Sequence, residues 1–273
     1  MPRIWFVTGA SRGLGRAIAQ AALDDGDLVA ATARNPSQLQ SLVDQYGEDR
    51  IIPLSLDVTD NEKIIEALNT TLDKFGRLDV LVNNAGYANV DSIEHVSIED
   101  FRKQFETNFF GTFLATKAAI PIMRKQGSGH IIQISSIGGR HGTPGLASYQ
   151  SAKWALGGFS TVLEKEIAPF GIKITVCEPG GIKTDWSGAS MGMAELQPGY
   201  EQTIGVATKQ RSELWEYFSE PAQMAKAIIH ISHVADPPLR LLLGKGMPDY
   251  GKAASEALAL SDEKWLKVTN LEV

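Results

Sequence analysis

A chain of 273 residues with 43% hydrophobic and 21% charged residues has a globular composition and is long enough to bury a full core. The net charge of −6 argues against non-specific binding to nucleic acid or to anionic membranes, and no apolar run is long enough to span a bilayer. The single cysteine, Cys177, cannot form an internal disulfide, and the start runs directly into a strand without a signal peptide, so we expect a cytoplasmic protein.

The first element along the chain is an apolar strand at 4–7, which a glycine-rich turn connects to a helix at 13–25. The Gly-x-x-x-Gly-x-Gly spacing of this turn allows the backbone to approach a pyrophosphate closely. The phosphates would face the free N–H groups at the start of the helix, where the helix dipole favours negative charge. The pattern predicts a dinucleotide site with contacts from Gly9, Ser11, Arg12, Gly13, Leu14 and Gly15.

The second strand, at 28–33, ends where a site for NAD usually places an acidic residue that binds the ribose hydroxyls. This chain has Ala33 followed by Arg34, and Arg12 already lies in the glycine turn. Two guanidiniums suit a 2′-phosphate through bidentate, charge-assisted hydrogen bonds. We therefore predict NADP(H) rather than NAD(H); the alternative is that Arg34 is a solvated residue at the end of a strand.

Strands and helices alternate along the rest of the chain. Further strands are expected at 51–56, 78–82, 130–135, 172–177 and 239–243, and long helices at 60–75, 98–123 and 149–168. This alternation predicts an α/β fold: a single-domain, doubly wound, Rossmann-type parallel sheet of about seven strands with helices on both faces. Thr8, Asn84, Ser136 and Pro179 each follow a predicted strand, so we expect them to converge at the carboxyl edge of the sheet.

Tyr149 and Lys153 lie four residues apart within the helix expected at 149–168, and therefore on one helix face. A tyrosine with its ordinary pKa of about 10 is a poor acid or base at neutral pH. A nearby ammonium favours the phenolate, so we expect Lys153 to lower the pKa of Tyr149 and to make it a proton donor or acceptor for a carbonyl or alcohol oxygen. Taken alone, the spacing also fits a simple pair on a helix surface.

The ordered set of motifs resembles the short-chain dehydrogenase/reductase family from Thr8 to about Gly246. The motifs are Thr8-Gly9-x-x-x-Gly13-x-Gly15, Asp57-Val58, Asn83-Asn84-Ala85-Gly86, Asn108, Ser136, Tyr149-x-x-x-Lys153 and Pro179-Gly180.

The resemblance implies a role for each matched residue. Tyr149 would be the catalytic acid/base, Lys153 would bind the nicotinamide ribose, and Ser136 would hydrogen-bond the substrate oxygen. Asn108 would hold a water that links Lys153 to solvent. The remaining matches imply cofactor contacts: Asp57 and Val58 at the adenine, Asn84, Ala85 and Gly86 along the adenosine and ribose, and Pro179, Gly180, Ile182 and Thr184 at the nicotinamide end. No metal ligand is expected.

Two segments depart from the regular alternation. The resemblance implies that the segment at about 185–219 is a mobile lid, and its content of aromatic and methionine residues suggests an apolar pocket with adaptable walls; the alternative is that these side chains anchor the lid. They are Trp186, Met191, Met193, Leu196, Tyr200, Trp215, Tyr217 and Phe218. His141 is a further candidate for the pocket wall, although a lone loop histidine is more often a surface residue.

The second departure is the C-terminal extension at 247–273, which follows the domain at 1–246 and carries an expected helix at 253–258. It would either cover a surface used for oligomer formation or wall the substrate site. We expect a homo-oligomer and favour a dimer.

These observations predict an NADP(H)-dependent carbonyl reductase or alcohol dehydrogenase that acts on a ketone, aldehyde or secondary alcohol with an apolar body. Two alternatives remain open from the sequence. One is an NAD-dependent dehydrogenase of the same family, and the other is a regulatory module that senses NADPH without turnover. Neither nucleic acid nor a membrane is an expected partner.

Overall fold

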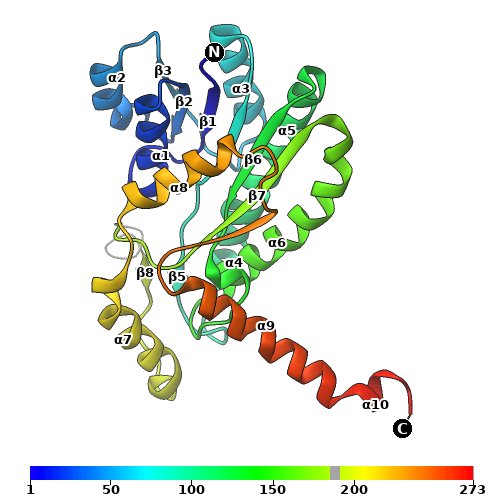
Figure 1. Cartoon of the computed structure of the whole chain (residues 1–273). Coiled ribbons are helices and arrows are strands. Elements are labelled where there is room, and N and C mark those ends of the chain that lie inside the picture. Colours follow the sequence, from blue (N-terminus) through cyan, green and yellow to red (C-terminus); the bar gives the residue numbers. More distant parts are fainter. Residues whose placement is uncertain (185–190, 273) are drawn as a thin grey trace.

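The computed structural model describes residues 1–184 and 191–272 and contains a sheet of seven parallel strands, which confirms the predicted fold class (Figure 1). The strand order is β3-β2-β1-β4-β6-β7-β9, so the chain runs outward in one direction from β1 and in the other from β4. Such a reversal opens a crevice at the carboxyl ends of the strands. The strands are β1 Ile4–Val7, β2 Leu28–Ala33, β3 Ile51–Ser55, β4 Val80–Asn83, β6 Gly129–Ile134, β7 Ile172–Pro179 and β9 Arg240–Leu243.

Helices cover both faces of the sheet, and each face has its own hydrophobic core. The strands contribute side chains to both cores, because successive side chains of a strand point to opposite faces of the sheet. Trp5 and Val7 of β1 belong to one cluster, and Phe6 belongs to the other. One layer consists of α1 Gly13–Asp24, α2 Gln40–Tyr46 and α8 Pro221–His233. The other consists of α3 Asn61–Phe75, α4 Ile98–Phe105, α5 Gly111–Gln126 and α6 Ala147–Ile167.

The helix expected at 98–123 differs from the prediction in being interrupted. Ser97 caps the start of α4 by accepting a hydrogen bond from Asp100 N over 3.0 Å. A π-helical turn at Glu106–Phe110 then separates α4 from α5, which continues to Gln126. One extra residue in a helical turn re-aims the side chains around it, and such π-bulges are frequent at functional sites.

The segment between β7 and α8 contains more regular structure than the sequence predicted. Strand β8 Gly192–Met193 pairs with β5 Asn89–Val90 in a small second sheet. A π-helical turn at Glu201–Gly205 leads into α7 Val206–Glu213, and a 3-10 turn at Trp215–Tyr217 follows. Trp186, expected in the lid, lies outside the described residues.

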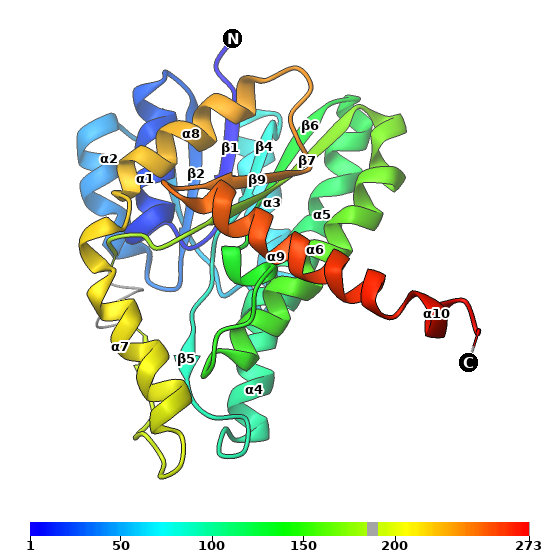
Figure 2. The same ribbon diagram turned by 60° about the horizontal axis from the view of Figure 1, so that its bottom comes forward.

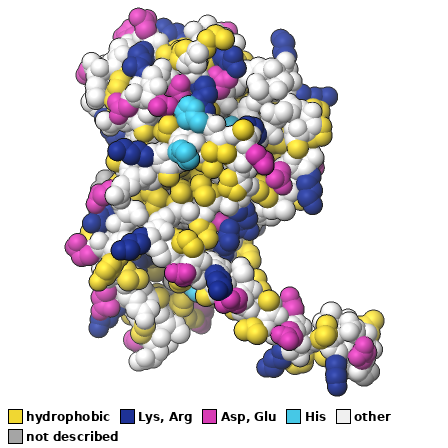
Figure 3. All heavy atoms as spheres, viewed as in Figure 1, with side chains coloured by type: hydrophobic (Ala, Val, Ile, Leu, Met, Phe, Trp, Pro, Cys, Tyr) yellow, Lys and Arg dark blue, Asp and Glu magenta, His cyan; other side chains and the backbone are white. Residues whose placement is uncertain are grey.

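The C-terminal extension forms one long helix, α9 Met247–Lys264, followed by the short α10 Leu266–Thr269. The helix expected at 253–258 is thus longer at both ends. Its first turns pack on β9, where Gly251 is buried against Leu242, and its second half projects away from the body of the molecule (Figures 1 and 2). Figure 3 shows charged and apolar side chains interspersed along the projecting part. None of the helices in the described part of the chain is long and apolar enough to cross a membrane.

Candidate active site

A cavity of about 820 Å³ lies at the carboxyl ends of the strands, and nearly every residue that the sequence singled out lines it. Among the residues predicted to bind the cofactor or to take part in catalysis, the exception is Gly15. The predicted residues that line it are Gly9, Ser11, Arg12, Gly13, Leu14, Arg34, Asp57, Val58, Asn84, Ala85, Gly86, Asn108, Ser136, Tyr149, Lys153, Pro179, Gly180, Ile182 and Thr184.

The glycine turn is held against the loop that follows β4. Thr8 Oγ1 accepts hydrogen bonds from the backbone N–H groups of Asn84 (2.9 Å) and Ala85 (3.0 Å). In return, the Asn84 side-chain amide donates to the carbonyl oxygens of Thr8 (3.0 Å) and Gly9 (3.1 Å). Asn84 therefore acts as a brace between the two loops that follow the neighbouring strands β1 and β4.

Gly15 explains why this turn needs glycine at a position that does not line the cavity. A Cβ atom there would lie 2.3 Å from the carbonyl oxygen of Gly9 and 2.4 Å from the side-chain nitrogen of Asn84. Arg12, the residue before α1, makes no side-chain capping bond to the helix start. The first N–H groups of α1 thus remain available at the cavity, an arrangement that fits a dinucleotide pyrophosphate.

Arg12 and Arg34 border the same cavity, and both are exposed. Within residues 1–184 and 191–272, no carboxylate forms an ion pair with either guanidinium. Asp57 is an acidic residue that lines the cavity. Its carboxylate accepts hydrogen bonds from Thr59 N (3.0 Å) and Thr59 Oγ1 (2.8 Å). Two exposed guanidiniums, which have no carboxylate partner among the described residues, therefore border this part of the cavity.

A different part of the cavity is lined by Ser136, Tyr149 and Lys153. The Lys153 ammonium lies 5.6 Å from the centroid of the Tyr149 ring and donates a hydrogen bond of 2.8 Å to the carbonyl oxygen of Ile134, at the end of β6. Ser136 follows β6 and hydrogen-bonds the Tyr149 hydroxyl. Both Tyr149 and Lys153 are buried.

The expected lowering of the pKa of Tyr149 is wrong for this structure. Burial of the phenol raises its pKa above the ordinary value, and the hydrogen bond from Ser136 offsets only part of that rise. Burial also lowers the pKa of Lys153 to about 8. Desolvation acts on both groups, so the spacing on the helix alone did not predict the direction. At neutral pH, Tyr149 is a protonated phenol and Lys153 is still charged.

Asn108 lies in the π-helical turn and is fully buried. Its Nδ2 donates to the carbonyl oxygens of Gln104 (2.8 Å) and Tyr87 (2.9 Å), and its Oδ1 accepts from Tyr87 N at 3.2 Å. The loop bearing Gly86 approaches closely, since a Cβ on Gly86 would be 2.5 Å from Asn108 Oδ1 and 3.8 Å from Lys153 Nζ. The π turn thus brings Asn108 next to Lys153.

Several lining residues were not predicted. Tyr87 directly follows the Asn-Asn-Ala-Gly motif, and Ser135 directly precedes Ser136, so proximity to a motif was the available signal. Glu106 and Thr107 precede Asn108 in the π turn, and Lys103 lies about one helical turn before them. The full set of unpredicted lining residues is Ala33, Leu56, Thr59, Tyr87, Lys103, Glu106, Thr107, Ile134 and Ser135.

His141 is not among the residues that line the cavity. Its ring packs edge-on against Tyr250 of α9, with the ring centroids 4.9 Å apart. The C-terminal extension does contact one lining residue, since a Cβ on Gly180 would lie 2.4 Å from Met247 Sδ. The first turn of the extension therefore packs against Gly180, a residue predicted at the nicotinamide end, although Met247 is not among the residues that line the cavity.

Fold and cavity together define a dinucleotide-binding α/β protein with a tyrosine, a lysine and a serine gathered at one end of the nucleotide cleft. Residues 3–193 match the family model for short chain dehydrogenase, and the chain belongs to the short-chain dehydrogenase/reductase family. It is an oxidoreductase of a family that uses a nicotinamide cofactor and acts on CH–OH and C=O groups.

Known relatives match almost the whole chain. Oxidoreductase BOA17 of Botryotinia fuckeliana is 51% identical over 270 residues, which cover 98% of each chain. A short-chain dehydrogenase from Streptomyces avermitilis, 39% identical, has a solved structure that superposes with a TM-score of 0.91 and covers 99% of this chain and 98% of its own. The alcohol dehydrogenase of the archaeon Thermococcus sibiricus, solved with 5-hydroxy-NADP, is 25% identical with a TM-score of 0.75, covering 90% of this chain and 98% of its own.

Proposed function

We propose that this protein is an NADP(H)-dependent carbonyl reductase or alcohol dehydrogenase that acts on a ketone, an aldehyde or a secondary alcohol. The observation that carries the proposal is that Ser136, Tyr149 and Lys153 line one cavity with the glycine turn and Arg34. A nucleotide cleft alone would fit a binding module equally well. A buried phenol held beside a serine hydroxyl and an ammonium is what proton transfer to a carbonyl oxygen requires.

When bound, NADPH supplies the hydride, and the residues of this chain orient the substrate and manage the proton. Hydroxyl groups of Ser136 and Tyr149 aimed at the carbonyl oxygen stabilise the negative charge that develops there. Tyr149 then releases its proton to that oxygen. Lys153, still charged below about pH 8, stabilises the resulting phenolate, and Asn108 holds the water through which the proton is replaced.

We assign the cofactor contacts to the residues around the cleft. The glycine turn from Gly9 to Gly15, together with the start of α1, would hold the pyrophosphate, and Arg12 and Arg34 would hold the 2′-phosphate. Lys153 would bind the nicotinamide ribose. The adenine and adenosine would meet Asp57, Val58, Asn84, Ala85 and Gly86, and the nicotinamide would meet Pro179, Gly180, Ile182 and Thr184.

We further propose that the substrate has an apolar body and that the segment at about 185–219 forms its lid. Tyr149 belongs to a hydrophobic cluster with Val90, Met191 and Ile204, and two of these residues come from that segment. Other side chains of the lid act as anchors instead: a Cβ on Gly181 would lie 2.2 Å from the ring of Phe218. The apolar surroundings of the phenol favour an alkyl or aryl ketone over a polar sugar.

A panel of ketones and aldehydes, with NADPH oxidation followed by absorbance, tests the proposal. We expect turnover of apolar carbonyl compounds with NADPH and a lower kcat/KM with NADH. Preference for NADH would support the NAD-dependent alternative and contradict the roles of Arg12 and Arg34. Binding of NADPH without turnover of any carbonyl compound would instead support the sensing module.

For the assembly and its compartment, we propose a homo-oligomer in the cytoplasm. Trp154 and Val162, two turns apart on α6, are 46% and 59% exposed, and Phe110, at the end of the π turn, is 41% exposed. Large apolar side chains gathered on adjacent helices favour contact with a second copy. The single buried cysteine fits a reducing compartment.

A further inference from the structure

A fully buried carboxylate lies just beyond the catalytic cavity and is held by two arginines. Glu178, in β7 immediately before Pro179, is 0% exposed. Its Oε2 accepts from Arg140 Nε at 2.7 Å and lies 2.5 Å from Arg140 Nη2. Its Oε1 accepts from Arg240 of β9, through Nε at 2.8 Å and also through Nη2. Charge-assisted bonds of this kind fix both partners in position.

Arg140 ends the turn that begins at Ser136. In this turn, Gly139 N donates to the Ser136 carbonyl oxygen at 2.9 Å, and Arg140 N donates to the Ile137 carbonyl oxygen at 2.9 Å. The Ser136 hydroxyl oxygen itself accepts from Gly138 N at 3.0 Å. Arg240 adds a bond of 3.4 Å to the Gly139 carbonyl oxygen. The two arginines thus connect Glu178 to the far end of the turn that carries Ser136.

The same turn also packs closely against α6, the helix of Tyr149 and Lys153. A Cβ on Gly138 would lie 2.7 Å from Gln150 Nε2, and a Cβ on Gly139 would lie 3.1 Å from the carbonyl oxygen of Lys153. The turn is therefore held both by the Glu178 ion cluster and by α6, which Arg240 also approaches, since a Cβ on Gly157 would lie 3.3 Å from Arg240 Nη2. Any shift of the turn changes where the Ser136 hydroxyl lies relative to the Tyr149 hydroxyl.

We infer that Glu178 is a positioning residue, which acts through Arg140 and Arg240 to hold the Ser136 hydroxyl beside that of Tyr149. The inference rests on the proposed function for its catalytic consequence. Without the carboxylate, two guanidiniums would face each other across the end of β7, and Arg140 would lose its hold on the turn. Small displacements of a positioned group are costly to a reaction that depends on orientation.

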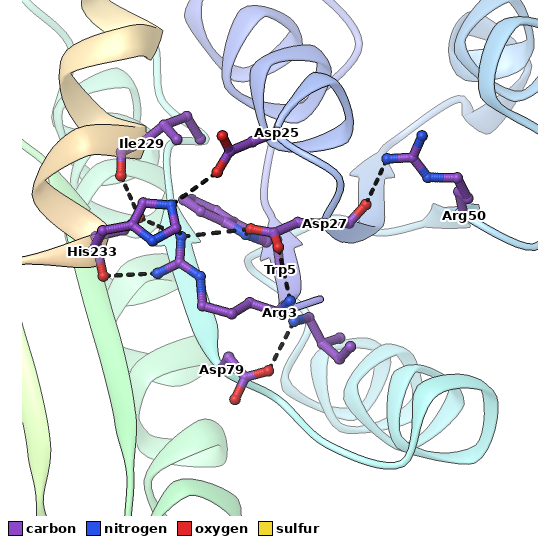
Figure 4. A network of polar contacts seen from close by, with 10 residues as sticks. Arg3, Trp5, Asp25, Asp27, Arg50, Asp79, Ile229 and His233 are labelled. Atoms are coloured by element: carbon purple, nitrogen blue, oxygen red, sulfur yellow. Dashed lines mark hydrogen bonds and ion pairs between the residues drawn. The ribbon is translucent and has the colours of Figure 1, made fainter. Parts of the chain in front are cut away.

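The chain offers a matched control at the opposite end of the sheet. Asp27, next to the start of β2, is a buried carboxylate that accepts hydrogen bonds from Trp5 Nε1 (2.7 Å) and Arg3 N (2.8 Å) (Figure 4). Asp25, Asp27 and His233 bring together ligand atoms of a kind that can hold a metal ion. The Arg3 guanidinium, 2.7 Å from His233 Nε2, already places a positive charge beside them. Asp27→Asn therefore disturbs a buried ionic network far from the catalytic cavity.

The experiment compares Glu178→Gln, Arg140→Met and Asp27→Asn with the wild type, each assayed well below its own unfolding temperature. We expect Glu178→Gln to lower kcat at least about tenfold, in line with the cost of misplacing a reacting group. The Kd for NADPH, measured by fluorescence titration, should change less than about threefold, because the glycine turn is untouched. Arg140→Met should lower kcat in the same direction, whereas Asp27→Asn should keep kcat within about twofold of the wild type.

Two further readouts separate positioning from general loss of stability. Hydrogen exchange of the backbone amides at 137–140 should accelerate in Glu178→Gln and stay unchanged in Asp27→Asn. In a Ser136→Ala background, Glu178→Gln should lower kcat by less than about twofold, because its effect passes through the missing hydroxyl.

The inference is overturned if Glu178→Gln keeps kcat within about twofold of the wild type, or if Asp27→Asn lowers kcat as much. Unchanged hydrogen exchange at 137–140 would overturn it as well. Failure of the proposed function looks different: the wild type itself would reduce no carbonyl compound, and the exchange experiment would still decide whether Glu178 holds the turn.

Discussion

Lys153 of α6 and Ile134 of β6 are joined by a hydrogen bond of 2.8 Å from the lysine ammonium to the backbone carbonyl oxygen. This bond fixes the end of a long side chain in a buried place, where Lys153 is only 4% exposed. Burial lowers the pKa of the ammonium to about 8, so its charge is lost just above neutral pH. The lysine that we propose as catalytic is therefore charged only up to about pH 8.

The first prediction concerns the pH dependence of carbonyl reduction. Lys153 is charged below about pH 8 and neutral above it, so kcat/KM in the reductive direction should be flat near neutral pH and fall above about pH 8. The limiting slope is about tenfold per pH unit for loss of one proton. A pH profile measured with saturating NADPH checks this. A rate that keeps rising through about pH 9 would contradict the role of the charged lysine.

The same shift has a consequence for stability, with the opposite sign. Because the pKa of Lys153 is lower in the folded protein than in the unfolded chain, its burial destabilises the fold below about pH 8, and this penalty fades as the pH rises toward the lysine's ordinary value. Burial of Lys153 thus lowers the stability of the folded protein, although the residue lies at the centre of the site. This combination is expected of a residue with a functional role.

The second prediction concerns cofactor choice. Arg34→Ala removes a guanidinium that we assign to the 2′-phosphate, so the KM for NADPH should rise about 10- to 100-fold, the effect of one charge-assisted hydrogen bond. The KM for NADH, which lacks that phosphate, should change little. Arg16→Ala is a suitable control, because Arg16 lies on α1 but bonds Gln38 O and Ser41 Oγ and does not line the cavity. Equal changes for both cofactors in Arg34→Ala would refute the assignment.

The third prediction concerns acid stability. His130 of β6 is 4% exposed, and burial lowers its pKa to about 4. The unfolded chain binds a proton near the ordinary pKa, so the stability that neutral His130 contributes is complete above about pH 6.5 and is lost as the pH falls toward 4. Between pH 7 and about pH 5, the free energy of unfolding should fall by about 2 kcal/mol from this group.

Urea unfolding of the wild type and of His130→Gln, at both pH values, measures this loss. Glutamine does not titrate and retains a group able to bond Thr175 Oγ1, which lies 2.9 Å from His130 Nε2. The variant should therefore show a smaller loss of stability on acidification. An identical pH dependence in both proteins would show that His130 is not responsible.

The sequence predicted those parts of the molecule that depend on local pattern. Apolar runs marked all seven strands of the main sheet to within two residues at each end, because parallel strands buried on both faces leave a continuous signal. The glycine turn was recognisable for a similar reason, since Gly15 lies closer to Gly9 and Asn84 than any residue with a Cβ atom could. Four motifs that each follow a strand converged because parallel strands end at one edge.

What the sequence did not predict depends on tertiary contacts. The π turn around Asn108 has no distinct pattern, because the residues there read as a continuous helix. The direction of the pKa change of Tyr149 depends on how deeply α6 is buried, which spacing along a helix does not reveal. The role of Glu178 was equally hidden, because its partners Arg140 and Arg240 are far away in the chain.

Replacement of Tyr149 by phenylalanine tests the central claim most directly. The control is Tyr46→Phe, because the Tyr46 hydroxyl bonds Asp24 outside the cavity. We predict that Tyr149→Phe lowers kcat for carbonyl reduction about 10²- to 10⁴-fold, because the proton donor is gone, and leaves the Kd for NADPH nearly unchanged. Retention of most of the wild-type kcat in Tyr149→Phe would contradict the account.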